Sequence, residues 1–124
     1  MIFAVSNRYK NRGGVYFIRS TITNDLYIGQ TKCFAARFDI HSNALRKNRH
    51  PDSDLLADYA KKYGYETLVF SIYKVDDDRT GAYYTEQALI KKLKPSMNRI
   101  FEYKLPSRLL LRNGTIIQPK RRTK

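Results

Sequence analysis

The sequence has a single cysteine, Cys33, among its 124 residues. One thiol cannot form an intramolecular disulfide, and it excludes a structural zinc site that uses two or more cysteines. No apolar run approaches the roughly 20 residues that a helix needs to cross a bilayer, and the N-terminus lacks the apolar core of a signal peptide. We therefore expect a soluble, cytoplasmic protein that does not bind membranes.

Acidic residues are also scarce, since 11 Asp and Glu face 24 Lys and Arg, a formal net charge of +13. Residues 1–13 have a net charge of +3, residues 14–98 also +3, and residues 99–124 have +7. The excess therefore lies mostly at the two ends, where it is typical of arms that bind phosphates. Basic tails that only keep a protein soluble are the alternative. Nucleic acid is the simplest partner for so basic a chain.

A chain of 124 residues has the length of one domain, and its 42% hydrophobic content is enough for one core. We expect a basic N-terminal arm over residues 1–12 and a globular domain over residues 13–99. A basic extension would follow over residues 100–124, ending in a tail that is disordered without a ligand.

Three segments are typical of β-strands. Residues 15–18 and 26–28 are rich in β-branched and aromatic side chains, and the polar stretch between them predicts a β-hairpin with a long loop. Residues 68–75 alternate between apolar and other side chains and predict a third strand. Asn113-Gly114 lies between two apolar runs and predicts a further hairpin near the C-terminus.

Helical periodicity predicts three helices, over about residues 32–48, from the capping residues 51–54 to Gly64, and over about residues 79–94. With the strands, this predicts an α+β fold. Its centre would be a small mixed or antiparallel three-stranded sheet flanked by the three helices, with the C-terminal hairpin as an extension.

Three polar residues lie on helix faces that are otherwise apolar. At about 100° per residue, Arg37 and His41 fall inside the apolar arc of the first helix, and Glu86 falls in the middle of the apolar face of the third. A buried charge is costly unless it is paired or faces a cleft. A cation, a proton-transfer group and a metal-binding carboxylate are what phosphodiester cleavage requires. A buried Arg37–Glu86 salt bridge beside a hydrogen-bonded His41 explains the same pattern.

Two other acidic patterns are candidate metal sites. Residues 76–78 are three aspartates before a helix, where capping the first turn is the commoner role. Asp52 after Pro51, taken with Glu102 and Lys104, mimics a two-carboxylate nuclease site, but its two parts are far apart in the sequence. We expect neither to be the functional site.

Motif spacing distinguishes between these alternatives. Gly14-Val15-Tyr16 and, after ten intervening residues, Tyr27-Ile28-Gly29 resemble the two-part signature of the GIY-YIG endonuclease family, with Val15 in place of the usual isoleucine. The resemblance extends over about residues 13–99. The family's later marks follow in order: Arg37, His41, His50, Tyr63-Gly64, Glu86 and Pro95 to Asn98, with Met97 where many members have tyrosine.

The resemblance implies an endonuclease that hydrolyses DNA with a divalent metal, usually Mg²⁺, with Mn²⁺ as a substitute. Glu86 would be the one protein carboxylate that binds the metal, and Arg37 would hold the scissile phosphate. Tyr16, Tyr27 and His41 complete the implied catalytic set, and which of the three is the general base stays open.

Further residues are expected to support these groups. By the resemblance, Gly14 and Gly29 serve backbone geometry, and His50 and Asn98 stabilise the catalytic groups or the fold. Candidate DNA contacts are the basic residues Lys32, Arg121 and Arg122.

Several biological roles are compatible with this pattern. A compact endonuclease of a phage or mobile element, of the homing type, suits a catalytic unit with short basic flanks. A restriction enzyme, a structure-selective repair nuclease and a non-catalytic nucleic-acid-binding module are the alternatives. Both a monomer and a homodimer are compatible with the sequence.

Overall fold

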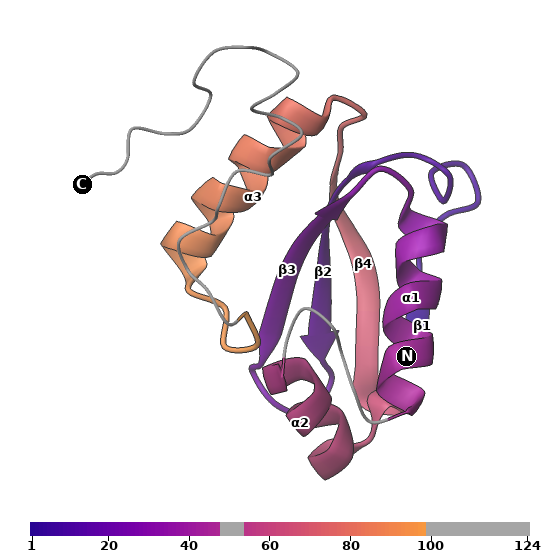
Figure 1. Cartoon of the computed structure of the whole chain (residues 1–124), viewed down its shortest axis with the longest axis vertical. Coiled ribbons are helices and arrows are strands. Elements are labelled where there is room, and N and C mark those ends of the chain that lie inside the picture. The colour runs from indigo at the N-terminus through magenta and orange to yellow at the C-terminus, as the bar shows by residue number, and fades with distance from the viewer. Residues whose placement is uncertain (48–53, 99–124) are drawn as a thin grey trace.

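A mixed β-sheet runs through the protein, as seen in a computed structural model that describes residues 1–47 and 54–98 (Figure 1). Strands β2 (Gly14–Ser20) and β3 (Leu26–Thr31) form the predicted antiparallel hairpin. Strand β4 (Leu68–Val75) pairs antiparallel with the other side of β2. Strand β1 (Ile2–Ala4) pairs parallel with β4, so the order across the sheet is β1-β4-β2-β3.

The fourth strand corrects the prediction of a three-stranded sheet. It lies inside residues 1–12, for which the sequence indicated only a basic arm. The ring of Phe3 lies 4.6 Å from that of Phe38 and 5.7 Å from that of Phe70, measured between centroids. A strand of three residues is too short for periodicity to reveal, and pairing with β4 and these aromatic contacts hold it in place.

The three predicted helices are present as α1 (Phe34–Arg46), α2 (Asp54–Tyr63) and α3 (Arg79–Leu93). A short 3₁₀ turn, η1 (Tyr65–Thr67), leads from α2 into β4. Gly64, at φ 94°, ends α2, and its N–H donates to the Ala60 carbonyl at 2.8 Å. The side chain of Asp78 caps α3 by accepting from the N–H of Thr80.

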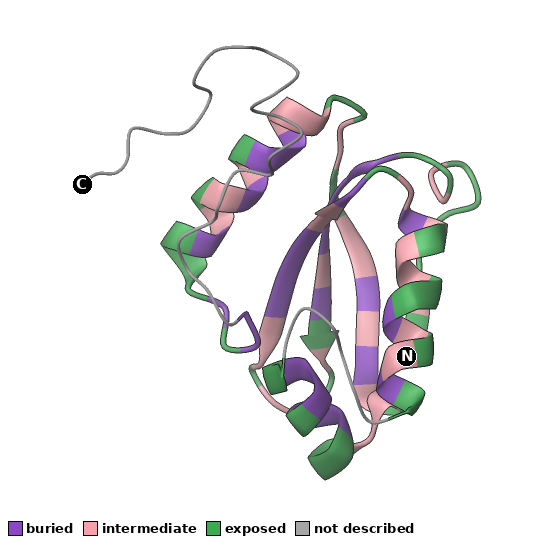
Figure 2. Ribbon diagram, viewed as in Figure 1, coloured by how far each residue is buried: buried purple, intermediate pink, exposed green. Residues whose placement is uncertain are grey.

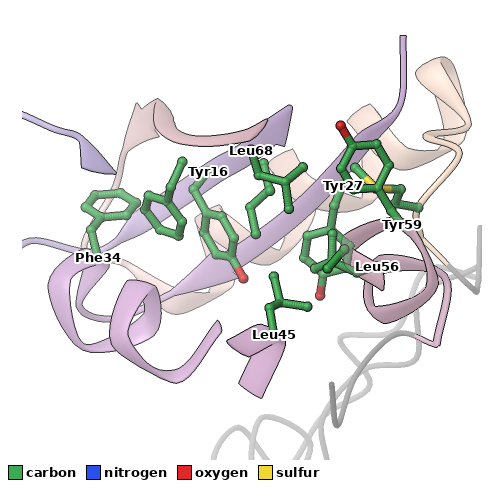
Figure 3. Packing of buried hydrophobic residues seen from close by; sticks show 11 residues of the cluster. Tyr16, Tyr27, Phe34, Leu45, Leu56, Tyr59 and Leu68 are labelled. Atoms are coloured by element: carbon green, nitrogen blue, oxygen red, sulfur yellow. The ribbon is translucent and has the colours of Figure 1, made fainter. Parts of the chain in front are cut away.

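The helices cover both faces of the sheet, with α1 and α2 on one face and α3 on the other (Figure 1). Successive residues of β2 alternate between the faces, so Tyr16 packs in the core under α1 and Val15 in the core under α3. Figure 2 shows the buried residues along the sheet and on the helix sides that face it. The α1 face has the larger core (Figure 3), which comprises Tyr16, Ile18, Tyr27, Phe34, Leu45, Leu56, Tyr59, Ala60, Leu68, Phe70 and Met97.

The segment after α3 returns along the outer edge of β3. The N–H of Met97 donates to the carbonyl of Leu26 at 2.9 Å. The side chain of Asn98 forms two hydrogen bonds with the backbone of Ile28, accepting from its N–H at 2.7 Å and donating to its carbonyl at 2.9 Å. These bonds satisfy backbone groups that an edge strand would otherwise leave unpaired.

Two predictions concern residues outside the described ones: the C-terminal hairpin around Asn113-Gly114 and the basic extension over residues 100–124. Within the described residues, no helix is both long enough and apolar enough to cross a membrane.

Candidate active site

Tyr16 and His41 form a buried pair between β2 and α1. The hydroxyl of Tyr16 lies 2.6 Å from Nε2 of His41, and the two side chains are 1% and 0% exposed. The ring of Tyr16 stacks on Phe70 of β4, with centroids 4.6 Å apart and planes at 16°. In Figure 3 the hydroxyl of Tyr16 points from the sheet toward α1 near Leu45. Packing therefore fixes the phenol, and the hydrogen bond fixes its polar end.

Arg37 joins this pair from the same helix face, because it lies four positions before His41, about one helical turn. Its Nε lies 3.5 Å from the hydroxyl of Tyr16, a long hydrogen bond. Arg37 is half-buried, whereas Tyr16 and His41 are buried. The guanidinium is therefore the member of this group that a ligand in solvent meets first.

Tyr27 of β3 completes the cluster on this face of the sheet. Its ring centroid lies 6.4 Å from that of Tyr16 and 5.5 Å from that of His41. Of the five predicted catalytic residues, the structure thus brings four together here: Tyr16, Tyr27, Arg37 and His41.

Gly29 provides the space that the phenol of Tyr16 occupies. The two residues are directly opposite in the β2–β3 ladder, and a Cβ on Gly29 would lie 2.5 Å from Cζ of Tyr16. Gly14 has a different constraint. Its φ of 152° is one that other residues rarely adopt, and a Cβ there would lie 2.8 Å from the backbone nitrogen of Asp76. Gly29 therefore affects the site directly, and Gly14 affects the backbone before Tyr16.

Glu86, the fifth predicted catalytic residue, comes from α3 on the other face of the sheet. Its side chain is only 5% exposed, and Oε1 is buried without a hydrogen-bond partner in the part of the chain described. Burial raises the pKa of Glu86 to about 8, against the opposing effects of Arg79, Arg37 and a hydrogen bond from Gln30. The charge of Arg37 thus acts on Glu86 as well as on the cluster around Tyr16.

The raised pKa of Glu86 argues against the alternative of a buried Arg37–Glu86 salt bridge. A carboxylate fully neutralised by a guanidinium has a lowered pKa, because the opposite charge favours the ionised form. Here burial outweighs both arginines. The carboxyl group is therefore undercompensated by the protein and suited to a further positive ligand.

The three aspartates before α3 have structural partners. Asp77 forms an ion pair with Arg12 at 2.6 Å and accepts from the N–H of Gly13 at 2.9 Å. Asp76 accepts from the N–H of Asp78 at 3.0 Å, and Asp78 caps α3. Among the described residues, no group of three or more His, Cys, Asp or Glu could hold a metal ion. The capping interpretation therefore holds for Asp78, whereas Asp77 instead pairs with Arg12 and Gly13.

Other predicted site residues lie away from the cluster. Asn98 braces β3 through Ile28, and Lys32 is exposed just before α1. His50, Arg121 and Arg122 lie outside the described residues.

Sequence reasoning missed Gln30 and Arg79, both of which act on Glu86. A signal for each was present. Arg79 precedes Glu86 by seven residues, two helical turns, and so shares its face of α3. Gln30 lies two positions after Ile28 in β3, so its side chain is on the same face of the sheet, where Ile28 packs under α3.

Comparison with known proteins identifies the family of the chain. A family model described as the GIY-YIG catalytic domain matches residues 12–100. The chain belongs to the GIY-YIG family. The resemblance seen in the sequence is thus confirmed, and residues 12–100 form a GIY-YIG nuclease domain.

Two solved structures resemble this GIY-YIG domain. The catalytic domain of the homing endonuclease I-TevI is 26% identical, with a TM-score of 0.62. A single-residue variant of the catalytic domain of the intron endonuclease I-TevI is 24% identical, with a TM-score of 0.67. Each likeness covers 77% of this chain and 99% of the other. No curated protein matches the chain.

Proposed function

We propose that this GIY-YIG protein is an endonuclease that hydrolyses phosphodiester bonds in DNA with the help of a divalent cation. The proposal depends most on one observation, the buried Tyr16–His41 hydrogen bond beside Arg37, which also acts on the carboxyl group of Glu86. The net charge of +13 favours a polyanionic substrate. The likeness to the I-TevI catalytic domain supports DNA as that substrate and a role in homing.

Glu86 fits the cation that the family implies. Its Oε1 is buried and has no protein hydrogen-bond partner among the described residues. A hard cation such as Mg²⁺, which keeps most of its waters, needs only one or two carboxylates together with phosphate oxygens, and Mn²⁺ suits the same ligands. When bound there, the cation would stabilise the negative charge that develops on the phosphate and the leaving oxygen.

The residues of the α1 face supply the remaining chemistry. Hydrolysis forms a bond from a water oxygen to phosphorus, removes a proton from that water, and breaks the bond from phosphorus to the leaving oxygen. Arg37 would hold the phosphate through its planar donors. Tyr16, Tyr27 and His41 would orient the attacking water, and one of the three would accept its proton.

Cleavage of supercoiled plasmid DNA tests the proposal. We expect cleavage with Mg²⁺ or Mn²⁺ and none with a chelator. The variants Glu86→Ala and Tyr16→Phe should each lose about 100-fold or more in rate, because one removes the cation ligand and the other the positioned hydroxyl. Asp58→Ala, at an exposed position of α2, is a matched control and should cleave normally.

The outcomes separate the candidate functions. Full cleavage by Glu86→Ala and Tyr16→Phe would refute the site assignment. DNA binding without cleavage by the wild type would identify a binding module. Mapping the cut ends would distinguish a homing enzyme, which cuts long specific sites, from a restriction enzyme or a structure-selective repair nuclease, and sedimentation would distinguish monomer from homodimer.

A further inference from the structure

Gln30 directly follows Gly29 in the chain but serves the opposite face of the sheet. Gln30 pairs with Val15 in the β2–β3 ladder, whereas Gly29 pairs with Tyr16. Because side chains alternate along a strand, Gln30 projects to the face that α3 covers, where Val15 and Ile28 pack. Consecutive residues of β3 thus contribute to the two halves of the site: Gly29 makes room for the phenol, and Gln30 reaches the carboxylate.

The contact between Gln30 and Glu86 is a side-chain hydrogen bond. This hydrogen bond lowers the pKa of Glu86, as a bond donated by the amide nitrogen of Gln30 does, because an ionised carboxylate only accepts. A hydrogen bond to the charged form favours that form, and it also restricts rotation of the carboxylate. Oε1 of Glu86 lacks a protein hydrogen-bond partner among the described residues. One oxygen therefore keeps lone pairs that no described group occupies, while the group as a whole is held.

The strand that carries Gln30 is fixed on both sides. β2 pairs with its inner edge, and Met97 and Asn98 bond to its outer edge at Leu26 and Ile28. A group on such a strand can hold a partner more precisely than a group on a loop. The amide of Gln30 is therefore well placed to fix the carboxylate of Glu86 relative to the sheet.

We infer that Gln30 is a positioning residue, whose amide holds the carboxylate of Glu86 so that Oε1 faces a divalent cation. This inference rests on the proposed function, because Glu86 is its cation ligand there. Residues that orient a metal ligand in this way commonly change metal affinity or activity by about 10–100-fold when they are replaced.

Direct binding of Mn²⁺ to the protein without DNA, followed by electron paramagnetic resonance and calorimetry, tests this role. Gln30→Met keeps the length of the side chain and removes the donor, and Gln30→Ala is a second variant. We expect both to weaken Mn²⁺ binding by about 10-fold or more, and to raise the Mn²⁺ concentration for half-maximal cleavage in parallel. Gln87→Ala, a glutamine change next to Glu86 on α3, is the matched control and should bind Mn²⁺ as the wild type does.

Thermal unfolding with a chelator separates positioning from simple structural support. A structural role would lower the melting temperature of the Gln30 variants and leave Mn²⁺ affinity unchanged, which would overturn the inference. Equal weakening by Gln87→Ala would also overturn it. Glu86→Ala separates the two proposals: if it cleaves normally, the proposed function itself fails. If Glu86→Ala is inactive while both Gln30 variants match the wild type, only the positioning role fails.

Discussion

The two faces of the sheet treat their buried polar groups in opposite ways. Under α1, the hydroxyl of Tyr16 and Nε2 of His41 satisfy each other at 2.6 Å, and Arg37 lies beside them. Under α3, Glu86 is buried with one oxygen that no described group satisfies, and burial raises its pKa to about 8. The first arrangement is complete within the protein, and we propose that a positive ligand completes the second.

This difference indicates that the two faces have different roles in the site. The α1 face offers a preformed arrangement of phenol, imidazole and guanidinium whose geometry does not require a ligand. The α3 face has a carboxyl group that burial keeps protonated at neutral pH, and a bound cation would shift it to the charged form. Proton release and cation binding should therefore be linked at Glu86, whereas the pair of Tyr16 and His41 should form without the cation.

The largest expected effect is on stability without divalent cations, where we compare the wild type with Glu86→Gln. Unfolded glutamate loses its proton near pH 4.5, whereas the folded protein keeps it until about pH 8. The unfolded state thus binds fewer protons in this window, so wild-type stability falls as the pH rises from about 4.5 to about 8 and then levels off. Glutamine does not titrate. In denaturant unfolding, the free energy of unfolding of the variant relative to that of the wild type should increase by about 2–5 kcal/mol between pH 5 and pH 8.

The range from pH 5 upward keeps two other shifted carboxyl groups out of this comparison. Hydrogen bonds from Ser96 and Thr23 lower the pKa of Asp25, and Arg12 lowers that of Asp77. Their stabilising effect is lost only as the pH falls below the usual value of 3.8. Parallel pH profiles for the wild type and Glu86→Gln would contradict the undercompensated carboxyl group. Added Mg²⁺ at pH 8 should reduce the difference between the two proteins.

The next effect concerns the preformed face, through Gly29→Ala. A new Cβ would lie 2.5 Å from Cζ of Tyr16 and 2.9 Å from its Cε2, so the phenol must move away from His41. Overpacking of this kind costs about 1–3 kcal/mol, and we expect cleavage to fall with it. The Tyr16→Ala background removes the clashing ring and is the control. Gly29→Ala should lower the free energy of unfolding less in that background. An equal loss in both backgrounds would refute the contact between position 29 and the Tyr16 ring.

The sequence predicted those parts of the fold that depend on local pattern. Alternation marked Leu68–Val75 as a strand, and helical periodicity with capping residues marked Arg79–Leu93 as a helix. Strand β1 was missed, because its three residues are held by pairing with β4 and by aromatic contacts at long range. Local patterns contain no information about such contacts.

The candidate site divides in the same way. Arg37 and Glu86 stood out because a charge on an apolar helix face is a local anomaly. Gln30 did not, since a polar residue in a strand is ordinary, and its role appears only when α3 is placed over β3. That the tyrosines lie on one face and Glu86 on the other also follows only from the order of strands in the sheet.

The smallest effect is expected at the strand that both faces share. Asn98→Ala removes two hydrogen bonds to Ile28 and should cost about 1–2 kcal/mol, because the buried backbone groups lose their partners. The amide of Ile28 should then exchange its hydrogen faster. Asn43→Ala, at an exposed position of α1, is the control and should change stability by no more than about 0.5 kcal/mol.

Strand β3 connects the two faces, because Gly29 lies opposite Tyr16 and Gln30 opposite Val15. Asn98→Ala should therefore weaken Mn²⁺ binding and loosen the phenol of Tyr16 together. If only Mn²⁺ binding or only the Tyr16 ring changed, the two halves of the site would be stabilised independently of each other.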